Sequence, residues 1–345
     1  STSLPASNFF PSFPHCQQQD EPQSWRIMQG RDASAALWRP GNFLAALGIW
    51  FLRGMARLPV PVLRRTGRVL GLLVWYVAPY RKRVVLANLR LCFPEWSEKE
   101  RRRVAREHYA SAGIGAFELG LAWYAPPEKL EPLVDYEGLE HIEAVRQSGR
   151  GALLVTGHFT CMELTGRMLT MRIPCGCLWR PLNQPRFRNE MQRIRAKHMD
   201  SVLPFQDTRA FIRILREGRN ILYTPDQGKR IKYSNLLPFF GIPAITNTAT
   251  GRIARMGRAA IVPFYGYRKP DGRYRVVIEP ERTDLPSDDP DADGLETNKM
   301  IERSARAAPE QYFWMHKRFK ARGPAYPDVY ASRANEDLSS ESAGR

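Results

Sequence analysis

The sequence lacks the short motifs that mark several large enzyme classes. It contains no G-x-G-x-x-G dinucleotide fingerprint, no Walker phosphate loop, no serine nucleophile elbow and no H-E-x-x-H helix. These absences argue against a dinucleotide-dependent enzyme, a P-loop enzyme, a serine hydrolase with that elbow and a zinc protease.

Cysteine is also scarce. The chain has five cysteines, an odd number without the spacing of a disulfide framework: Cys16, Cys92, Cys161, Cys175 and Cys177. We therefore expect reduced thiols, as in a cytoplasmic protein. Cys175 and Cys177 would supply half of a metal site, but no second half with ligand spacing follows, so we predict no metal.

Negative charge is in short supply. The chain has 35 acidic residues against 52 lysines and arginines, which gives a formal net charge of +17. This balance says nothing about the fold, but it favours an anionic partner: nucleic acid, an acidic protein or a phosphate-bearing membrane surface. With 345 residues, of which 43% are apolar, the chain can build one large globular domain or two small ones.

No apolar run is long enough to cross a membrane unaided. The runs 41–52 and 69–80 each have about a dozen residues, whereas a spanning helix needs about 20. Arg53 and Arg57 follow the first run, and Trp38, Trp50 and Trp75 supply rings suited to the headgroup level. We predict that this N-terminal region anchors the protein, either lying in the interface or spanning with help from its flanks. The alternative is a pair of buried core helices.

Composition divides the chain into four parts. Residues 1–37 are polar, rich in Pro and Gln, and lack the apolar core of a signal peptide, so we expect a disordered lead. Residues 38–80 would form the membrane-anchoring or interfacial helices, and residues 81–330 the main domain. We expect residues 331–345 to be a disordered tail.

The main domain alternates between strand-like and helix-like stretches. Short apolar runs predict strands at 152–155, 221–224, 259–264 and 273–278, and helical patterns lie at 187–199, 208–218 and 248–257. Ser97 and Glu100 form a capping box that predicts the start of a charged helix, which continues as an apolar one to Pro126. Residues 281–294 are expected to form an acidic, Pro-rich loop. The fold class is therefore α/β, with a mixed, mostly parallel central sheet flanked by helices and an N-terminal hydrophobic anchoring helix.

The stretch "GALLVTGHFTCMELTGR", residues 151–167, carries the main candidate for chemistry. His158 follows a predicted buried strand, where reactive groups gather in an open α/β sheet. A neutral imidazole could deprotonate an alcohol, with Glu163 as the carboxylate that orients it. On a regular helix these two residues lie about 140° apart, so the pairing needs His158 in the turn before the helix or at its first residue. Gly157 would permit such a turn because it tolerates unusual φ. The alternative is a satisfied histidine at a helix end.

Five stretches occur together in the order and spacing of one family. They are "VVLANLRLCFPEWSEKERRRV" (84–104), "GHFTCMELTGR" (157–167), "WRPLNQPRF" (179–187), "YTPDQG" (223–228) and "APEQYFWMHKRFKAR" (308–322). With them, the chain from Trp38 to Tyr326 resembles the late acyltransferases of lipid A biosynthesis, the lauroyl/myristoyl type, within the lysophospholipid-acyltransferase-like superfamily.

The resemblance implies an enzyme at the cytoplasmic face of the bacterial inner membrane, with the acyltransferase domain over residues 81–330. It would move a fatty acyl group from acyl carrier protein to a hydroxyl of a Kdo-bearing lipid A precursor. No metal or organic cofactor is implied beyond the carrier's phosphopantetheine thioester. The carrier protein and the lipid A phosphates are both acidic, which would account for the positive charge without nucleic acid.

The resemblance also implies roles for single residues. His158 would be the general base and Glu163 its orienting carboxylate. Arg180 in "WRP" would be the donor to the oxyanion or a ligand of a headgroup phosphate; its alternative is a surface arginine. Asp226 would shape the site or cap a helix, and Gln227 is a weaker substrate-binding candidate. His316 is expected to be structural, with its neighbours Lys317, Arg318 and Lys320 meeting phosphate.

Two other functions stay open at this point. An acyltransferase of the same superfamily could act on another glycolipid or phospholipid. A basic membrane- or nucleic-acid-binding protein without catalysis would need no His158 and would gather basic residues and exposed aromatics on one surface. The basic residues are instead spread over many predicted helices, which favours the enzyme.

Overall fold

The computed structural model describes residues 40–331, apart from 181 and 230. The predicted lead, Trp38 and all but the first residue of the predicted tail lie outside the described residues. The helices are α2 (Pro40–Met55), α3 (Val60–Val77), α4 (Pro79–Cys92), α5 (Glu98–Tyr124), α6 (Pro127–Leu130), α7 (Leu139–Gln147), α8 (Met162–Thr170), α9 (Pro185–His198), α10 (Thr208–Arg216), α11 (Ala249–Gly257) and α12 (Pro290–Ala307). The strands are β1 (Val134–Glu137), β2 (Ala152–Val155), β3 (Cys175–Trp179), β4 (Val202–Pro204), β5 (Asn220–Tyr223), β6 (Ser234–Phe239), β7 (Ile242–Asn247), β8 (Ala260–Arg268) and β9 (Tyr274–Ile278).

Seven of these strands form the central sheet, in the order β1-β9-β8-β2-β5-β3-β4. Every neighbouring pair is parallel except β8 with β9. The predicted mixed, mostly parallel sheet is confirmed. Because β2, β5 and β3 are parallel neighbours, their carboxyl ends meet at one edge of the sheet. A separate antiparallel hairpin of β6 and β7 lies apart from it.

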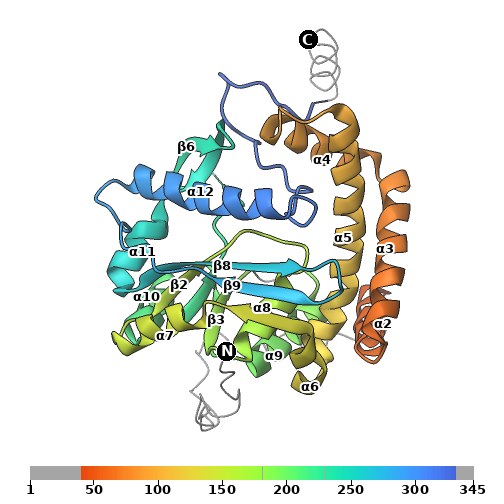
Figure 1. Ribbon diagram of the computed structural model, residues 1–345, viewed down its shortest axis with the longest axis horizontal. Helices are drawn as coiled ribbons and strands as arrows, with labels where there is room; N and C mark the ends of the chain where they lie inside the picture. Colours follow the sequence, from red (N-terminus) through yellow and green to blue (C-terminus); the bar gives the residue numbers. More distant parts are fainter. Residues whose placement is uncertain (1–39, 181, 230, 332–345) are drawn as a thin grey trace, which may run out of the picture.

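Helices cover both faces of the sheet, as predicted (Figure 1). Alternate residues of β2 point to opposite faces. Leu153 and Val155 pack in a cluster with residues of α10, α11 and α12, including Phe211, Ala254 and Met300. Ala152 and Leu154 belong instead to the larger core that contains residues of α5, α7 and α8. Both faces of β2 are therefore buried, which is why its sequence is a continuous apolar run.

The long helix α5 begins as the capping box predicts. The backbone N–H of Glu100 donates to the Ser97 hydroxyl at 3.2 Å, while the Glu100 carboxylate binds Arg103 instead of returning to the cap. In Figure 1, α5 runs along one side of the sheet with α3 and α2 outside it. Close packing against α3 requires glycine, because a Cβ on Gly71 would lie 2.1 Å from the carbonyl oxygen of Tyr109.

The expected acidic loop at 281–294 ends sooner than predicted, because α12 begins at Pro290. Asp289 caps this helix by accepting from the backbone N–H of Asp291 at 2.9 Å. Asp291 and Asp293 lie in its first turn, where acidic side chains interact favourably with the helix dipole. The acidic residues therefore start a helix where composition alone suggested a loop.

The two N-terminal helices expose apolar side chains on their outer surfaces. The exposed fraction of Trp50 is 71% and that of Val77 is 77%, with Phe43, Leu44, Leu47, Leu73 and Tyr76 also exposed. The alternative of two buried core helices is therefore wrong. None of the helices among the described residues combines the length and the apolar character that crossing a bilayer requires.

Candidate active site

His158 lies in the loop between β2 and α8, at the edge where the parallel strands end. Because α8 begins only at Met162, His158 is in the turn before the helix. The loop is held from the other side by the chain near residue 312: Phe313 N–H donates to the His158 carbonyl at 2.9 Å, and Thr160 N–H donates to the Gln311 carbonyl at 2.8 Å. These bonds fix the backbone on both sides of the histidine.

Gly157 is needed here for space. It is not among the glycines with positive φ, so the expectation of an unusual backbone conformation is wrong. A Cβ at this position would lie 2.9 Å from the side chain of Ile301 and 3.1 Å from the ring of Tyr312. The glycine therefore allows the loop to pack against α12 and the segment that follows it.

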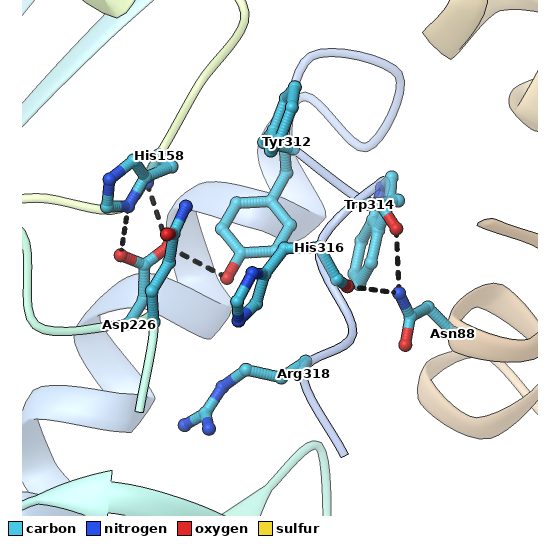
Figure 2. Close-up of a pocket in the computed structure, with 9 residues that line it drawn as sticks. Asn88, His158, Asp226, Tyr312, Trp314, His316 and Arg318 are labelled. Atoms are coloured by element: carbon cyan, nitrogen blue, oxygen red, sulfur yellow. Dashed lines mark hydrogen bonds and ion pairs between the residues drawn. The ribbon is translucent and has the colours of Figure 1, made fainter. Parts of the chain in front are cut away.

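The carboxylate that binds the His158 imidazole is Asp226, which follows β5. The His158 Nδ1 atom lies 2.5 Å from Asp226 Oδ1, and the His158 backbone N–H donates to Asp226 Oδ2 at 2.8 Å. Asp226 is only 2% exposed, whereas the side chain of His158 is 25% exposed. Nε2 forms no hydrogen bond with any described residue, and Figure 2 shows it pointing away from Asp226. One ring nitrogen is thus held, and the other is free to act.

The contact between His158 and Asp226 shifts the pKa of both residues. Burial by itself would raise the pKa of Asp226, but the charge and hydrogen bonds of His158 outweigh burial and lower it to about 2. Burial would lower the pKa of His158, but the neighbouring carboxylate outweighs this and raises it above its ordinary value of 6.5. The imidazole is therefore a stronger base than a free histidine, with a permanently ionised partner.

Glu163 does not bind His158, so the predicted pairing of these two residues is wrong. Its carboxylate accepts two hydrogen bonds from Arg195 of α9, at 2.7 and 3.1 Å, and one from the indole N–H of Trp123 at 3.2 Å. The physical reason is its place in the first turn of α8, on the side that faces α5 and α9. Both glutamate oxygens have donors, and the imidazole has its own carboxylate.

The Glu163–Arg195 pair lines a cavity of about 60 Å³. The cavity lies at the carboxyl ends of β2 and β5: Thr156 and Thr224, the residues that directly follow these strands, contribute to its wall. The rest of the lining is mostly apolar: Met162, Gly166, Cys177, Leu178, Met199, Leu222 and Phe264. Burial would lower the pKa of Arg195, but Glu163 and Cys177 outweigh it and raise that pKa, so the guanidinium stays charged.

Tyr312 is a site residue that the sequence did not single out. Its hydroxyl donates to Asp226 Oδ2 at 3.0 Å (Figure 2). Burial and the Asp226 charge raise the pKa of Tyr312 well above its ordinary value, so the phenol keeps its proton. The only available signal was its position within the motif stretch 308–322.

A small cavity of about 10 Å³ lies beside this network, lined by His158, Asp226, Gln227, Tyr312 and His316 among others. Gln227 therefore lines the same cavity as His158, and its role in substrate binding stays a prediction. His316 is also at its wall, and burial lowers its pKa to about 4. The histidine is thus neutral at pH 7.

Arg318 contradicts the expectation that it meets phosphate. Its side chain is buried, and its guanidinium donates to the Ile245 carbonyl at 2.6 Å. Lys317 stacks over the rings of Tyr80 and Tyr330. Lys317 thus holds the C-terminal segment against α4, and Arg318 holds it against the β6–β7 hairpin.

Arg180 follows β3 at the same edge of the sheet. It is exposed and makes no hydrogen bond or ion pair with any described residue. It lines neither of the two cavities described above. The structure thus brings His158, Asp226 and Gln227 together and places Glu163 at a neighbouring cavity. Arg180 lies on the surface at the same edge of the sheet, outside both cavities.

The described cysteines, Cys92, Cys161, Cys175 and Cys177, are free and buried. Burial raises the pKa of Cys161 to about 12 and that of Cys177 to about 11. At pH 7 these thiols stay protonated, so neither is an activated nucleophile.

The arrangement at His158 suits proton removal from a hydroxyl. It combines a free imidazole nitrogen, a buried carboxylate on the other nitrogen, and two further donors that fix that carboxylate. A base of this kind is used in acyl transfer, where it activates the attacking alcohol and then protonates the leaving group.

Comparison with known proteins agrees with this chemistry. Residues 32–321 match the family model "Bacterial lipid A biosynthesis acyltransferase". The chain is 37% identical to the lipid A biosynthesis lauroyltransferase of Escherichia coli K12 over 299 residues, which cover 86% of this chain and 98% of that protein. It is 31% identical to the palmitoleoyltransferase (84% and 95% covered) and 29% identical to the myristoyltransferase (84% and 91% covered) of the same organism.

Proposed function

Because the chain belongs to the bacterial lipid A biosynthesis acyltransferase family, we propose that His158, oriented by Asp226, is the base that activates the acceptor hydroxyl. The protein is an acyltransferase of lipid A biosynthesis. The observation that carries the assignment of the base is the 2.5 Å contact between His158 Nδ1 and Asp226, which leaves Nε2 free.

The proposed acceptor is a Kdo-bearing lipid A precursor, and the proposed donor is a fatty acyl thioester of acyl carrier protein. The net charge of +17 supports two acidic substrates. The three relatives are named for lauroyl, palmitoleoyl and myristoyl groups, so membership of the family leaves the acyl group open.

The proposed reaction is a direct acyl transfer. Nε2 of His158 takes the hydroxyl proton as the acceptor oxygen attacks the thioester carbonyl, which becomes a tetrahedral oxyanion. When the intermediate collapses, the C–S bond breaks and the imidazolium returns its proton to the departing sulfur. An ester and a free thiol result, so atoms and charges balance. Asp226 stabilises the imidazolium, and Tyr312 and the His158 backbone N–H keep Asp226 in place.

Arg180 is the proposed donor to the oxyanion. Its position after β3 places it at the same edge of the sheet as His158 and Asp226, which follow β2 and β5. A fixed positive group near the developing charge lowers the barrier to acyl transfer. Its exposed guanidinium has no competing carboxylate among the described residues.

The proposed location is the cytoplasmic face of the inner membrane, with α2 and α3 lying in the interface. The support is the exposed apolar surface of these helices, including Trp50 and Tyr76, together with their arginines. A flotation assay with vesicles tests this. Removal of residues up to 65, which deletes α2 and the start of α3, should weaken binding, and a truncated protein that floats as well as wild type in high salt would place the anchor elsewhere.

The activity itself is tested by incubating the purified protein with acyl carrier protein thioesters of several chain lengths and a radiolabelled lipid A precursor. We expect label in a more acylated product with the wild-type protein. His158→Ala should lower turnover by about 10²–10⁴-fold while the protein stays folded. Near-normal turnover by a folded His158→Ala protein would contradict the assignment of the base.

A further inference from the structure

A third, larger hollow lies between α2 and α9, separate from the residues around His158. It is open to solvent and has a volume of about 370 Å³. Its lining is Ala46, Ile49, Trp50 and Arg53 from α2, and Arg186, Asn189, Glu190 and Arg193 from α9. The volume falls within the range of about 300–1,000 Å³ that is usual for small-molecule sites. We refer to it as the α2–α9 groove.

The groove presents three guanidinium groups and one carboxylate. Glu190 accepts a hydrogen bond from Arg53 at 3.0 Å, two from Arg193 at 2.8 and 3.0 Å, and one from the Tyr124 hydroxyl at 2.7 Å. Its side chain is only 11% exposed, and the hydrogen bond from Arg193 is the largest of the effects that lower its pKa to about 2. An ionised carboxylate that is mostly shielded from solvent thus holds two of the three arginines in place.

The third arginine has no carboxylate partner among the described residues. Arg186 contacts the carbonyl oxygen of Asn42 at 3.4 Å. The lining therefore carries an excess of two positive charges on forked donors. Such groups suit a phosphate, which accepts two parallel hydrogen bonds from a guanidinium.

The membrane-facing surface of α2 adjoins the groove. Trp50 lines the groove and is at the same time 71% exposed, and its neighbours Leu47 and Phe51 are also exposed. A tryptophan of this kind sits at the headgroup level of a bilayer. A ligand held here would keep an anionic headgroup among the arginines while its acyl chains lie in the lipid beside α2.

The other side of α9 faces the cavity lined by Glu163 and Arg195. Arg195 lies two residues after Arg193, about 200° around the helix, and binds Glu163 at the 60 Å³ cavity. One helix thus separates the α2–α9 groove from the cavity at the ends of β2 and β5. A lipid headgroup in the groove would therefore lie on the opposite side of α9 from the cavity that Glu163 and Arg195 line.

We propose that the α2–α9 groove binds a phosphate on the headgroup of the lipid acceptor, with Arg186 and Arg193 as its main ligands and Arg53 beside them. This inference rests on the proposed function and adds a binding site to it. Anionic phospholipids carry the same chemical group, so the experiment separates the two sources.

The test uses full-length protein in uncharged detergent micelles, with a precursor that carries two phosphates and with the two precursors that lack one of them. The Arg186→Ala/Arg193→Ala variant should raise the KM for the doubly phosphorylated acceptor by about ten- to a hundredfold, with saturated turnover and the KM for the acyl donor unchanged. One of the singly phosphorylated acceptors should show almost no further loss, because the phosphate that the groove binds is already gone. Arg213→Ala on α10, whose side chain is exposed, is the matched control and should behave as wild type.

Other outcomes would overturn the proposal. A fall in saturated turnover with an unchanged KM would assign the arginines to chemistry or folding. An equal effect on all three acceptors, together with weaker binding to vesicles that contain phosphatidylglycerol, would assign the groove to bulk phospholipid. Direct binding of the acceptor to His158→Ala protein, with and without the two arginine changes, measures the groove without turnover. The experiment can therefore contradict phosphate binding in the groove while His158 remains the proposed base. It can equally support phosphate binding when the assignment of the base is contradicted.

Discussion

The carboxylates of Asp226, which follows β5, and Glu163, in the first turn of α8, have different surroundings. Asp226 is 2% exposed and receives hydrogen bonds from the His158 ring, the His158 backbone and Tyr312. The side chain of Glu163 is 24% exposed and receives its hydrogen bonds from Arg195 and Trp123. One carboxylate has a partner that can gain and lose a proton and whose pKa it raises, and the other has a partner that is always charged.

The difference in partner decides what each carboxylate can do. A carboxylate beside an imidazole changes that group's proton affinity and can stabilise its charged form during a reaction. A carboxylate beside a guanidinium cannot tune a base, because arginine does not release its proton. Glu163 therefore fixes the position of Arg195 at its cavity, whereas Asp226 acts on the chemistry of His158.

The largest effect is expected where the titrating partner is changed. Asp226→Asn keeps the shape of the side chain but removes its charge, and we expect turnover to fall by about 10²–10⁴-fold.

The pH profile of the Asp226→Asn enzyme gives the more specific result. The base must be neutral to act, so the acid limb of wild-type kcat/KM should lie above pH 6.5, because Asp226 raises the pKa of His158. Without the charge only burial remains, which lowers this pKa, so the limb should move to lower pH. An unmoved limb would show that Asp226 does not act through the histidine.

Arg180 at the rim should give the next largest effect. If it stabilises the oxyanion, Arg180→Ala should lower kcat by about 10²–10³-fold with little change in either KM. Arg180→Lys should recover only part of the loss, since lysine lacks the planar fork. Steady-state kinetics of both variants, beside Arg213→Ala as a surface control, measure this. A raised KM for the acceptor with turnover preserved would instead make Arg180 a phosphate ligand.

Glu163→Gln sharpens the contrast between the two carboxylates. It removes the charge that holds Arg195, and we expect a loss of about tenfold in kcat/KM without movement of the acid limb. The matched control is Glu143→Gln, which removes an exposed pair with Arg146 on α7 and should change nothing measurable. If the limb moves as in Asp226→Asn, Glu163 rather than Asp226 tunes the histidine during turnover.

The smallest effect is expected from Tyr312→Phe. The change deletes one hydrogen bond to Asp226 and leaves the imidazole contact intact, so kcat should fall by about three- to tenfold. Tyr136→Phe deletes a comparable hydroxyl bond, to the Met168 carbonyl, outside the site and serves as the control. A Tyr312→Phe enzyme with the kinetics and pH profile of wild type would remove Tyr312 from the positioning network.

Much of the fold could be predicted because its signals are local. The apolar run of β2 lies where the sequence places it, and β5, β8 and β9 differ from the predicted strands only in their ends. The Ser97 cap needs only residues within one helical turn. The strands β1, β3, β4, β6 and β7 were not predicted. Glycine or proline interrupts the apolar pattern of β3, β4, β6 and β7, and two of the four residues of β1 are acidic, so none of them shows the continuous apolar run that marked the predicted strands.

The sequence by itself determined the family, the histidine proposed as the base and the edge of the sheet that holds it, since motif order and a strand followed by Gly157-His158 can be read along the chain. Only the tertiary structure decided which carboxylate binds the imidazole of His158. Glu163 is five positions from His158 but faces α5 and α9, whereas Asp226 is 68 positions away and in contact. Parallel neighbours β2 and β5 end at the same edge, so residues far apart in sequence meet there. Closeness along the chain predicts contact only within a helix or a turn, and this site lies between strands.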